Sequence, residues 1–150
     1  MAIGVQVTFD AVDAHRLARF WADALHYQKE DHSAFIAQLV AAGQLQPADV
    51  VDDEGRQAFR DVAACRDPDG AGPRLFFQNV PEPKTTKNRV HLDLNVGRAA
   101  VEAENVGRAA VEAEAARLMG LGATLAWTSD DRGAYAMTLR DLEGNELCVH

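Results

Sequence analysis

The sequence predicts an α+β fold made of two copies of one unit, in which a strand and a helix precede further strands. Three pairs of matching segments follow one another in the same order: VQVTFD (5–10) with VHLDLN (90–95), LARFWADAL (17–25) with AARLMGLGA (115–123), and RDPDG (66–70) with RDLEG (140–144). Such ordered matches indicate a tandem duplication. We expect module one at about residues 1–80, a linker at 81–88 and module two at about 89–150.

Each module opens with an alternating strand. In NRVHLDLNV, residues 88–96, the apolar side chains point one way and the polar ones the other: Val90, Leu92, Leu94 and Val96 against His91, Asp93 and Asn95. Because strand side chains alternate with a period of two, one face covers a core and the other sees water or a cavity.

A helix should follow the first strand. Asp13 is a suitable N-cap. Apolar residues then recur at spacings of three and four, which predicts one stripe lying on a sheet: Leu17, Phe20, Trp21 and Leu25. We expect this helix to end near His26.

The rest of module one is predicted as a short strand at 28–32, a helix at 33–45 and a hairpin of strands 59–66 and 73–80 around the turn DPDGAG. The helix has no counterpart in module two, and it is either a flap over a site or plain packing. The prolines of the linker 81–88 are unsuited to a helix or a central strand.

Module two contains the same ten residues twice, NVGRAAVEAE at 95–104 and at 105–114. Ten residues advance a helix by about 1000°, which leaves a side chain roughly 80° from its original face. We expect the first copy to finish the strand and begin the helix, and the second to continue it through Gly107 to about Met119. A looped-out copy is the alternative.

Three strands should complete module two: TLAWT (124–128), AYAMTLR (134–140) and ELCVH (146–150). The polar segment SDDRG, residues 129–133, is predicted as a loop, and DLEGN, residues 141–145, as a turn.

Composition favours one domain of two modules. The 150 residues are 47% hydrophobic, enough for a single core. A formal net charge of −8 with scattered basic residues argues against nucleic-acid and membrane partners. We find no signal sequence or spanning segment, so we expect a cytoplasmic protein in which Cys65 and Cys148 are reduced thiols.

These elements together resemble the vicinal oxygen chelate superfamily, in its glyoxalase-like branch (the glyoxalase/bleomycin resistance/dioxygenase group). The matching segments cover most of the chain in family order: VTFDAVDAHRLARFWADALHY, the RDPDG turn, GPRLFFQNVPEPKTTKNRVHLDL, the LGA turn and RDLEGNELCV. The resemblance implies two tandem βαβββ modules that form an eight-stranded half-open barrel flanked by helices. It places the polar face of His91 toward the barrel cavity.

The resemblance also implies metal ligands on the first and last strands of each module. Gln6 and His91 fall at the first-strand positions, where related enzymes use His or Gln. Cys148 falls where the family has glutamate, and Gln78 is the best match in module one. Amides and a thiol suit Mg²⁺ and Mn²⁺ poorly, whereas zinc accepts an imidazole and a thiolate.

Two neighbours share the strand face of Cys148 by alternation, Glu146 and His150, and a shifted register would bring either into the site. We therefore treat Gln6, His91, Cys148 and Glu146 as candidate ligands. The expected cofactor is a divalent metal (Zn, Ni, Mn or Fe), and a metal-free site is the alternative.

His91 is the candidate catalytic residue, and the alternative is a cavity-wall histidine hydrogen-bonded to Asp93. The alternative for Cys148 is a small buried hydrophobe, the usual fate of free cysteine.

Four residues are candidate substrate-binding residues. Gln6 and Gln78 would orient a polar group of the ligand. Trp127 and Tyr135 would stack on it, with core packing as the alternative.

The sequence thus predicts a glyoxalase-like protein that binds a small organic molecule and acts as a metal-assisted lyase or isomerase. Glyoxalase I activity is not expected, because the carboxylates usual in that enzyme are missing. A metal-free small-molecule binder or antibiotic-sequestering protein is one alternative, and an interaction module with a vestigial pocket is another. Family cavities are often completed by a partner subunit, which makes a homodimer an expectation.

Overall fold

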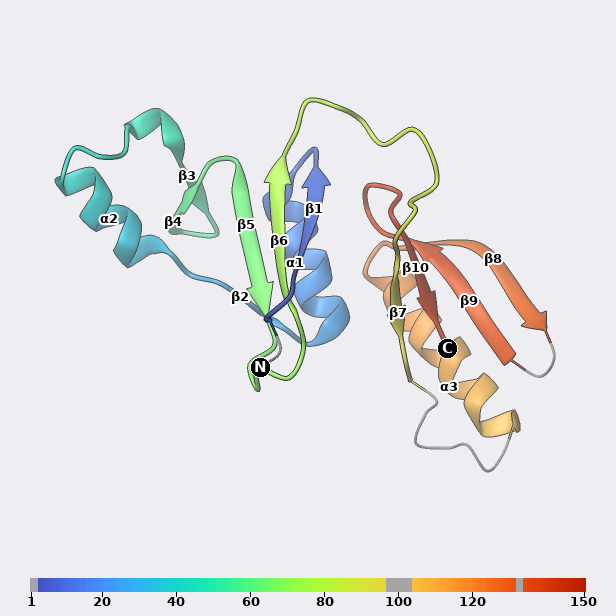
Figure 1. Ribbon diagram of the computed structural model, residues 1–150. Helices are drawn as coiled ribbons and strands as arrows, with labels where there is room; N and C mark the ends of the chain where they lie inside the picture. Colours follow the sequence, from blue (N-terminus) through green and yellow to red (C-terminus); the bar gives the residue numbers. More distant parts are fainter. Residues whose placement is uncertain (1–2, 97–103, 132–133) are drawn as a thin grey trace. The chain divides into compact units, whose positions relative to one another are not determined.

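The computed structural model describes residues 3–96, 104–131 and 134–150. The chain divides into two compact units, Met1–Pro83 and Lys84–His150 (Figure 1). Each unit has its own sheet and its own long helix, and we describe each by itself. Among the described residues no helix is both long and apolar enough to cross a bilayer.

Unit one contains a four-stranded sheet in the order β1-β6-β5-β2. Its strands are β1 (Gln6–Ala11), β2 (Gln28–Lys29), β5 (Val62–Arg66) and β6 (Arg74–Asn79). β1 and β6 are parallel, whereas β5 pairs antiparallel with β6 and with β2. The predicted hairpin and the short predicted strand are therefore both present.

Helix α1 (Ala14–Leu25) covers one face of this sheet and packs on β5 and β6. The Asp13 carboxylate accepts a hydrogen bond from the backbone N–H of Arg16, and His26 ends the helix with φ 57°. The apolar stripe is confirmed, because Leu17, Phe20 and Trp21 are buried. Cap, stripe and end all lie where the sequence predicts them.

An insert follows β2 in unit one only. It comprises α2 (Ser33–Ala41), the short 3-10 helix η1 (Pro47–Asp49) and a hairpin of β3 (Val50–Asp53) and β4 (Arg56–Phe59), visible beyond β5 in Figure 1. The extra helix is confirmed but ends at Ala41. The hairpin was not predicted, and its turn has positive φ at both central residues, Glu54 (55°) and Gly55 (80°).

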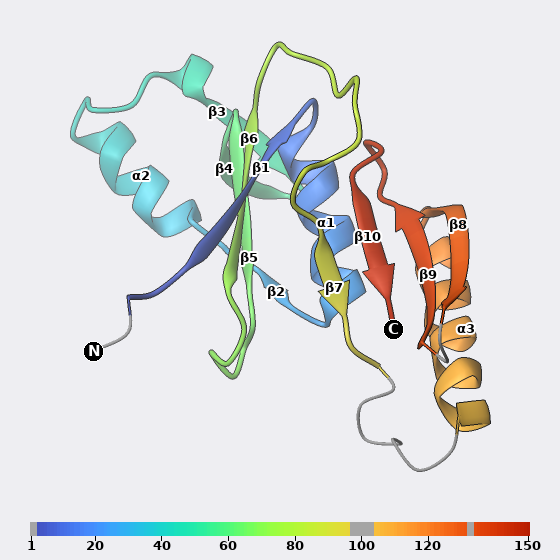
Figure 2. The ribbon, with the colours of Figure 1, turned by 45° about the vertical axis from the view of Figure 1, so that its right-hand side comes forward.

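Unit two repeats the arrangement. Its elements are β7 (Leu92–Leu94), α3 (Glu104–Gly120), β8 (Thr124–Asp131), β9 (Ala134–Arg140) and β10 (Glu146–Val149). The sheet order is β7-β10-β9-β8, with β7 parallel to β10 (Figure 2). These strands take the places of β1, β6, β5 and β2, so the α+β class with two tandem βαβββ modules is confirmed.

Two boundaries in unit two differ from prediction. The loop predicted at 129–133 is wrong for residues 129–131, which belong to β8 and pair with β9. β7 begins only at Leu92, and Val90 is 79% exposed. Backbone hydrogen bonds from His150 to Leu94 and from Val96 to His150 nevertheless continue the contact with β10 beyond β7.

The ten-residue repeat is seen in part. Its second copy lies in α3, which contains Gly107 and ends at Gly120, close to the predicted end. Residues 97–103 of the first copy are outside the described residues. The helix packs on β9 and β10 through a buried stripe, Val111, Ala115 and Leu118.

Candidate metal centre

The sheet of unit two has one face against α3 and one open face. Leu92, Leu94, Leu147 and Val149 belong to the helix-covered face. On the open face the strand registers place one residue from each strand in a transverse row: Asp93, Cys148, Thr138 and Trp127. The opening strand of module two therefore directs its polar side chains away from the core, as its alternation predicts.

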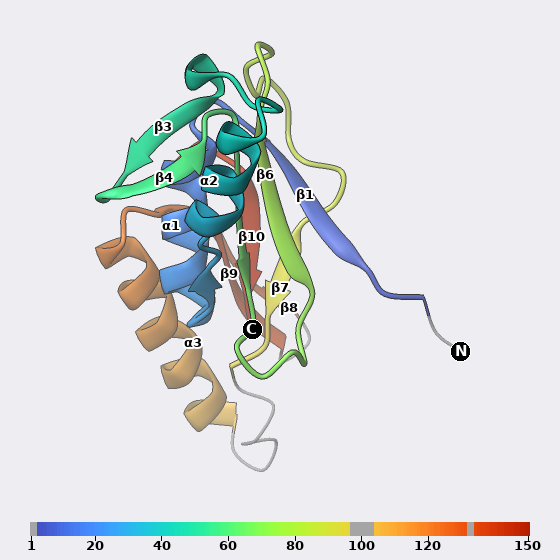
Figure 3. The same ribbon diagram turned by 90° about the vertical axis from the view of Figure 1, so that its left-hand side faces the viewer.

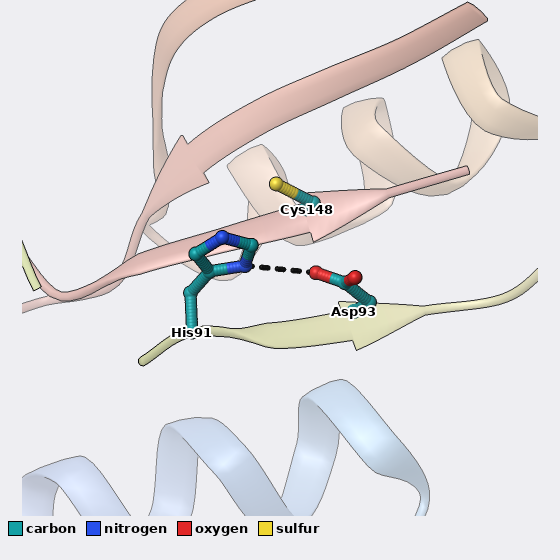
Figure 4. A group of neighbouring side chains, drawn as sticks. All are labelled: His91, Asp93 and Cys148. Atoms are coloured by element: carbon teal, nitrogen blue, oxygen red, sulfur yellow. Dashed lines mark hydrogen bonds and ion pairs between the residues drawn. The ribbon is translucent and has the colours of Figure 1, made fainter. Parts of the chain in front are cut away.

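Three potential metal ligands meet on this face. One donor atom from each of His91, Asp93 and Cys148 lies within 4.8 Å of the other two. Asp93 comes from β7, His91 directly precedes β7, and Cys148 comes from β10 (Figure 4). The parallel pairing that puts Cys148 opposite Asp93 therefore builds the cluster.

The His91 ring is held by Asp93. Its Nδ1 lies 2.8 Å from Asp93 Oδ1. An ionised carboxylate only accepts hydrogen bonds, so Nδ1–H is the donor, and the lone pair of the ring is on Nε2. An ion bound by both side chains would have to replace this hydrogen bond, with Asp93 turning from Nδ1 toward the metal.

Two further side chains border the cluster. His150 Nε2 lies 3.7 Å from Asp93 Oδ2, and Thr138 Oγ1 lies 3.3 Å from Cys148 Sγ. The His91 side chain is 36% exposed and Cys148 is half-buried, so solvent reaches the cluster.

The other cysteine has a different environment. Cys65 is fully buried on the helix-covered side of β5. Burial, followed by the nearby Glu30 carboxylate, raises the pKa of the Cys65 thiol to about 12. This thiol stays protonated at neutral pH, which leaves Cys148 as the cysteine able to bind metal.

Glu146 is not part of the cluster. Its carboxylate accepts a hydrogen bond from the Asn88 backbone N–H at 2.9 Å and lies 3.2 Å from Lys84 Nζ. Burial alone would raise the pKa of Glu146, but the Asn88 hydrogen bond and Lys84 outweigh it and the pKa is lowered. The structure thus places this predicted ligand in an ion pair beside the linker.

Gln6 lies on the open face of the sheet in unit one. Its Oε1 accepts a hydrogen bond from Arg74 Nη1 at 2.6 Å. Arg74 also binds Glu30 through two hydrogen bonds, of 2.8 and 2.7 Å. A guanidinium beside the amide oxygen disfavours a cation at Gln6.

Gln78 donates a hydrogen bond to Asp10 at 2.8 Å. The register shows that it is not the counterpart of Cys148. Cys148 pairs with Asp93, and in unit one Phe76 pairs with Thr8, the residue aligned with Asp93. The position equivalent to Cys148 is therefore Phe76, two residues before Gln78.

The two predicted aromatic residues lie on opposite faces. Trp127 is on the open face, 41% exposed, and pairs with Thr138. Tyr135 is on the face toward α3, where its hydroxyl donates to Glu112 at 3.2 Å and Arg108 lies 4.2 Å from its ring centroid. Only Trp127 shares a face with His91 and Cys148.

The donor set of the cluster fits a zinc-like ion. It offers an imidazole nitrogen, a carboxylate oxygen and a thiolate sulfur, all ligands that Zn²⁺ accepts. Ligand atoms around a tetrahedral zinc lie roughly 3.3–3.8 Å apart at bond lengths of about 2.0–2.3 Å. A spread of at most 4.8 Å is compatible with one ion after side-chain rotation.

Sequence reasoning named His91 and Cys148 but assigned Asp93 only as a partner of His91. The signal was present, because Asp93 is two residues after His91 on an alternating strand and so shares its face.

Comparisons with known proteins show the same fold. A model of the glyoxalase-like domain matches residues 6–150. The fosfomycin resistance protein FosX from Mesorhizobium loti is 13% identical with a TM-score of 0.60, over 100% of this chain and 92% of that one. A variant of FosX from Listeria monocytogenes, solved with Mn(II) and a dihydroxypropylphosphonic acid, is 9% identical with a TM-score of 0.59, over 100% and 90%.

The bleomycin-binding protein from Streptomyces verticillus, solved with copper(II)-bleomycin, is 15% identical with a TM-score of 0.53, over 99% of this chain and 98% of that one. No curated protein sequence matches. At these identities the solved structures show the fold alone. Two of those named here contain a bound small molecule. The family match over residues 6–150 shows that the chain belongs to the glyoxalase-like domain family.

Proposed function

We propose that this protein binds a small oxygen-bearing organic molecule beside a divalent metal ion held by His91, Asp93 and Cys148. The observation that carries the proposal is the convergence of three different donor atoms within 4.8 Å on the open face of one sheet. A thiolate selects zinc over Mg²⁺ and Mn²⁺, which prefer oxygen ligands, so zinc is the proposed ion.

The proposed chemistry is a lyase or isomerase reaction next to a carbonyl or similar oxygen. A bound zinc ion supplies Lewis acidity that stabilises negative charge developing on that oxygen. If His91 and Asp93 bind the same ion, their bonds to the metal would replace the 2.8 Å hydrogen bond between them. The exposed Trp127 ring offers an apolar surface for the substrate on the same face.

The named relatives support this proposal by their ligands. One FosX structure contains Mn(II) and a phosphonic acid, and the bleomycin-binding protein contains a copper(II) complex of its ligand. Gln6 and Gln78 stay proposals as residues that orient the ligand. The homodimer and the cytoplasmic location likewise stay predictions.

Metal content tests the proposal. Protein prepared without chelating resin and then incubated with Zn²⁺ should retain one equivalent after desalting, measured by atomic emission. His91→Ala and Cys148→Ser should each weaken zinc binding by about 10²-fold or more, because each removes one ligand. Phe76→Ala, at the equivalent position in unit one, is the matched control and should bind zinc normally.

The metal proposal is wrong if the wild-type protein retains no metal after exposure to Zn²⁺, Ni²⁺, Mn²⁺ and Fe²⁺. The second candidate, a metal-free binder, would then replace it. Its supporting observation is that Arg74 occupies the amide oxygen of Gln6, so unit one presents a cation where a metal ligand is expected. A thermal-shift screen in chelator tests it, since a ligand at 100 times its Kd stabilises by about 2.7 kcal/mol.

A further inference from the structure

A buried threonine lies beside the thiol of Cys148. Thr138 Oγ1 is 3.3 Å from Cys148 Sγ, and Thr138 is only 4% exposed. Thr138 comes from β9, which runs antiparallel beside β10, and the register pairs it directly with Cys148 (Figure 3). The backbones of two paired strands therefore hold the hydroxyl and the thiol next to each other.

The direction of this hydrogen bond follows from the state of the sulfur. In the free thiol either atom can be the donor. A thiolate has no proton, so its sulfur only accepts and the Thr138 hydroxyl has to donate. The thiolate is also the form of cysteine that binds a metal ion. One lone pair of the sulfur then binds the ion, and another remains for the hydroxyl.

The hydroxyl of Thr138 has no second hydrogen-bond partner in the part of the chain that the structure describes. A hydroxyl that is taken out of water without a hydrogen bond costs free energy. The contact with Cys148 therefore satisfies a group that would otherwise be unfavourable at this buried position.

Unit one carries a different pair at the equivalent positions. Phe76 stands where unit two has Cys148, and its partner on β5 is Ala64, which stands where unit two has Thr138. The hydroxyl is thus present beside the thiol, and a methyl group is present beside the ring. This difference indicates that Thr138 serves the sulfur, because the sheet alone accepts alanine at the same place.

We propose that Thr138 is a positioning residue of the metal centre, whose hydroxyl donates to the Cys148 thiolate and stabilises it as a ligand. The inference rests on the proposed function, since it needs an ion bound by Cys148. Thr138 does not bind the ion itself and acts through the sulfur. Hydrogen-bonding partners of metal ligands typically contribute about 10–100-fold to metal affinity.

Two matched pairs of proteins isolate the hydroxyl. Thr138→Val replaces it with a methyl group of similar size, and Thr138→Ala differs from Thr138→Ser by the oxygen alone. Zinc affinity is measured on the full chain by competition with a chelator. We expect an affinity about tenfold lower for valine than for the wild type, and about tenfold lower for alanine than for serine.

Thr128→Val is the control variant. It makes the same change at an exposed threonine of β8 and should leave zinc affinity unchanged. If Thr138→Val does not fold, the comparison of alanine with serine still decides the question.

Two further readouts separate a positioning role from a merely structural one. With Co²⁺ in place of zinc, the sulfur-to-metal charge-transfer band should move to longer wavelength in Thr138→Val, because a hydrogen bond lowers the energy of the sulfur lone pairs. In a Cys148→Ala background the sulfur is absent, so adding Thr138→Val should cause no further loss of affinity.

Three results would overturn this inference and leave the metal centre intact. They are equal zinc affinity within the two matched pairs, a charge-transfer band that does not move, and the same tenfold loss in the Cys148→Ala background. A wild-type protein that binds no metal would overturn the proposed function and this inference together.

Discussion

The open faces of the two sheets carry different chemistry on the same backbone plan. Unit two presents His91, Asp93 and Cys148, which are three metal-binding side chains. The equivalent positions of unit one hold Gln6, Thr8 and Phe76, an amide, a hydroxyl and a ring. Duplication therefore kept the geometry while the exposed side chains diverged, and only one copy has a complete donor set among the residues described.

The helix-covered faces of the two sheets, by contrast, have kept the same apolar character. Each position of unit one has an apolar counterpart in unit two: Val7 with Leu92, Phe9 with Leu94, Leu75 with Leu147, and Phe77 with Val149. These side chains fill the space beneath a helix, where a polar group would lose its water without gaining a partner. Packing therefore limits which side chains the helix-covered face can carry, whereas the side chains of the open face can change.

One equivalent position on the open faces carries opposite charges in the two units. Arg74 starts β6 in unit one, and Glu146 starts β10 at the equivalent position in unit two. Arg74 donates hydrogen bonds to Gln6 and Glu30. Glu146 accepts hydrogen bonds from Lys84 and Asn88. Among the described residues of unit two, the ion pairs of Asp93 are with His91 and His150, not with a lysine or an arginine.

The largest expected effect comes from the equivalent buried leucines of the two separate cores. Leu75→Ala and Leu147→Ala should each lower the free energy of unfolding by about 2–5 kcal/mol, because both side chains are fully buried. Urea denaturation measures both. Leu125→Ala, at a side chain that is 46% exposed, is the control and should cost clearly less. If either substitution lowers the free energy of unfolding by less than about 1 kcal/mol, the two helix-covered faces are not equivalent in packing.

A smaller effect concerns the reversed charge. Because the pKa of Glu146 is lowered on folding, its contribution is present above the unfolded value of about 4.3 and is lost as pH falls through the lower folded value. Glu146→Gln should therefore cost about 1–2 kcal/mol at pH 7 and progressively less below pH 4. Urea titrations across pH check this, and a difference that grows toward low pH would contradict it.

The smallest effect separates the units. Asp13→Ala removes the cap of α1 and should cost about 1 kcal/mol, whereas Asp13→Asn keeps an acceptor and should cost little. Hydrogen exchange should become faster in α1 and stay unchanged in α3. Equal acceleration in α3 would show that the two units open together.

Much of the fold follows from the sequence, because hydrophobic period and capping are local. Asp13, the stripe ending at Leu25 and the DPDGAG turn place α1 and the β5–β6 hairpin correctly. The β3–β4 hairpin was missed because its turn is Glu54-Gly55 rather than the stronger Asn-Gly or Asp-Gly signal. The end of β8 was missed because an edge strand with exposed polar residues looks like a loop.

The site was harder to predict because it depends on register. His91 and Cys148 could be located by counting from the helix cap and from the turn at Gly144. In unit one the hairpin is longer: Cys65 pairs with Leu75, whereas Leu139 pairs with Leu147. This difference shifts the count, and so the sequence pointed to Gln78 where the structure has Phe76.

The parallel pairing of β7 with β10 joins the first and last strands of unit two. An ion shared by His91, Asp93 and Cys148 would act as a cross-link closing nearly the whole unit into one loop, and it could form only after the sheet is complete. Its affinity would then add to the resistance of this unit to unfolding and to proteolysis. Metal supply would in that case control the lifetime of half the molecule as well as its chemistry.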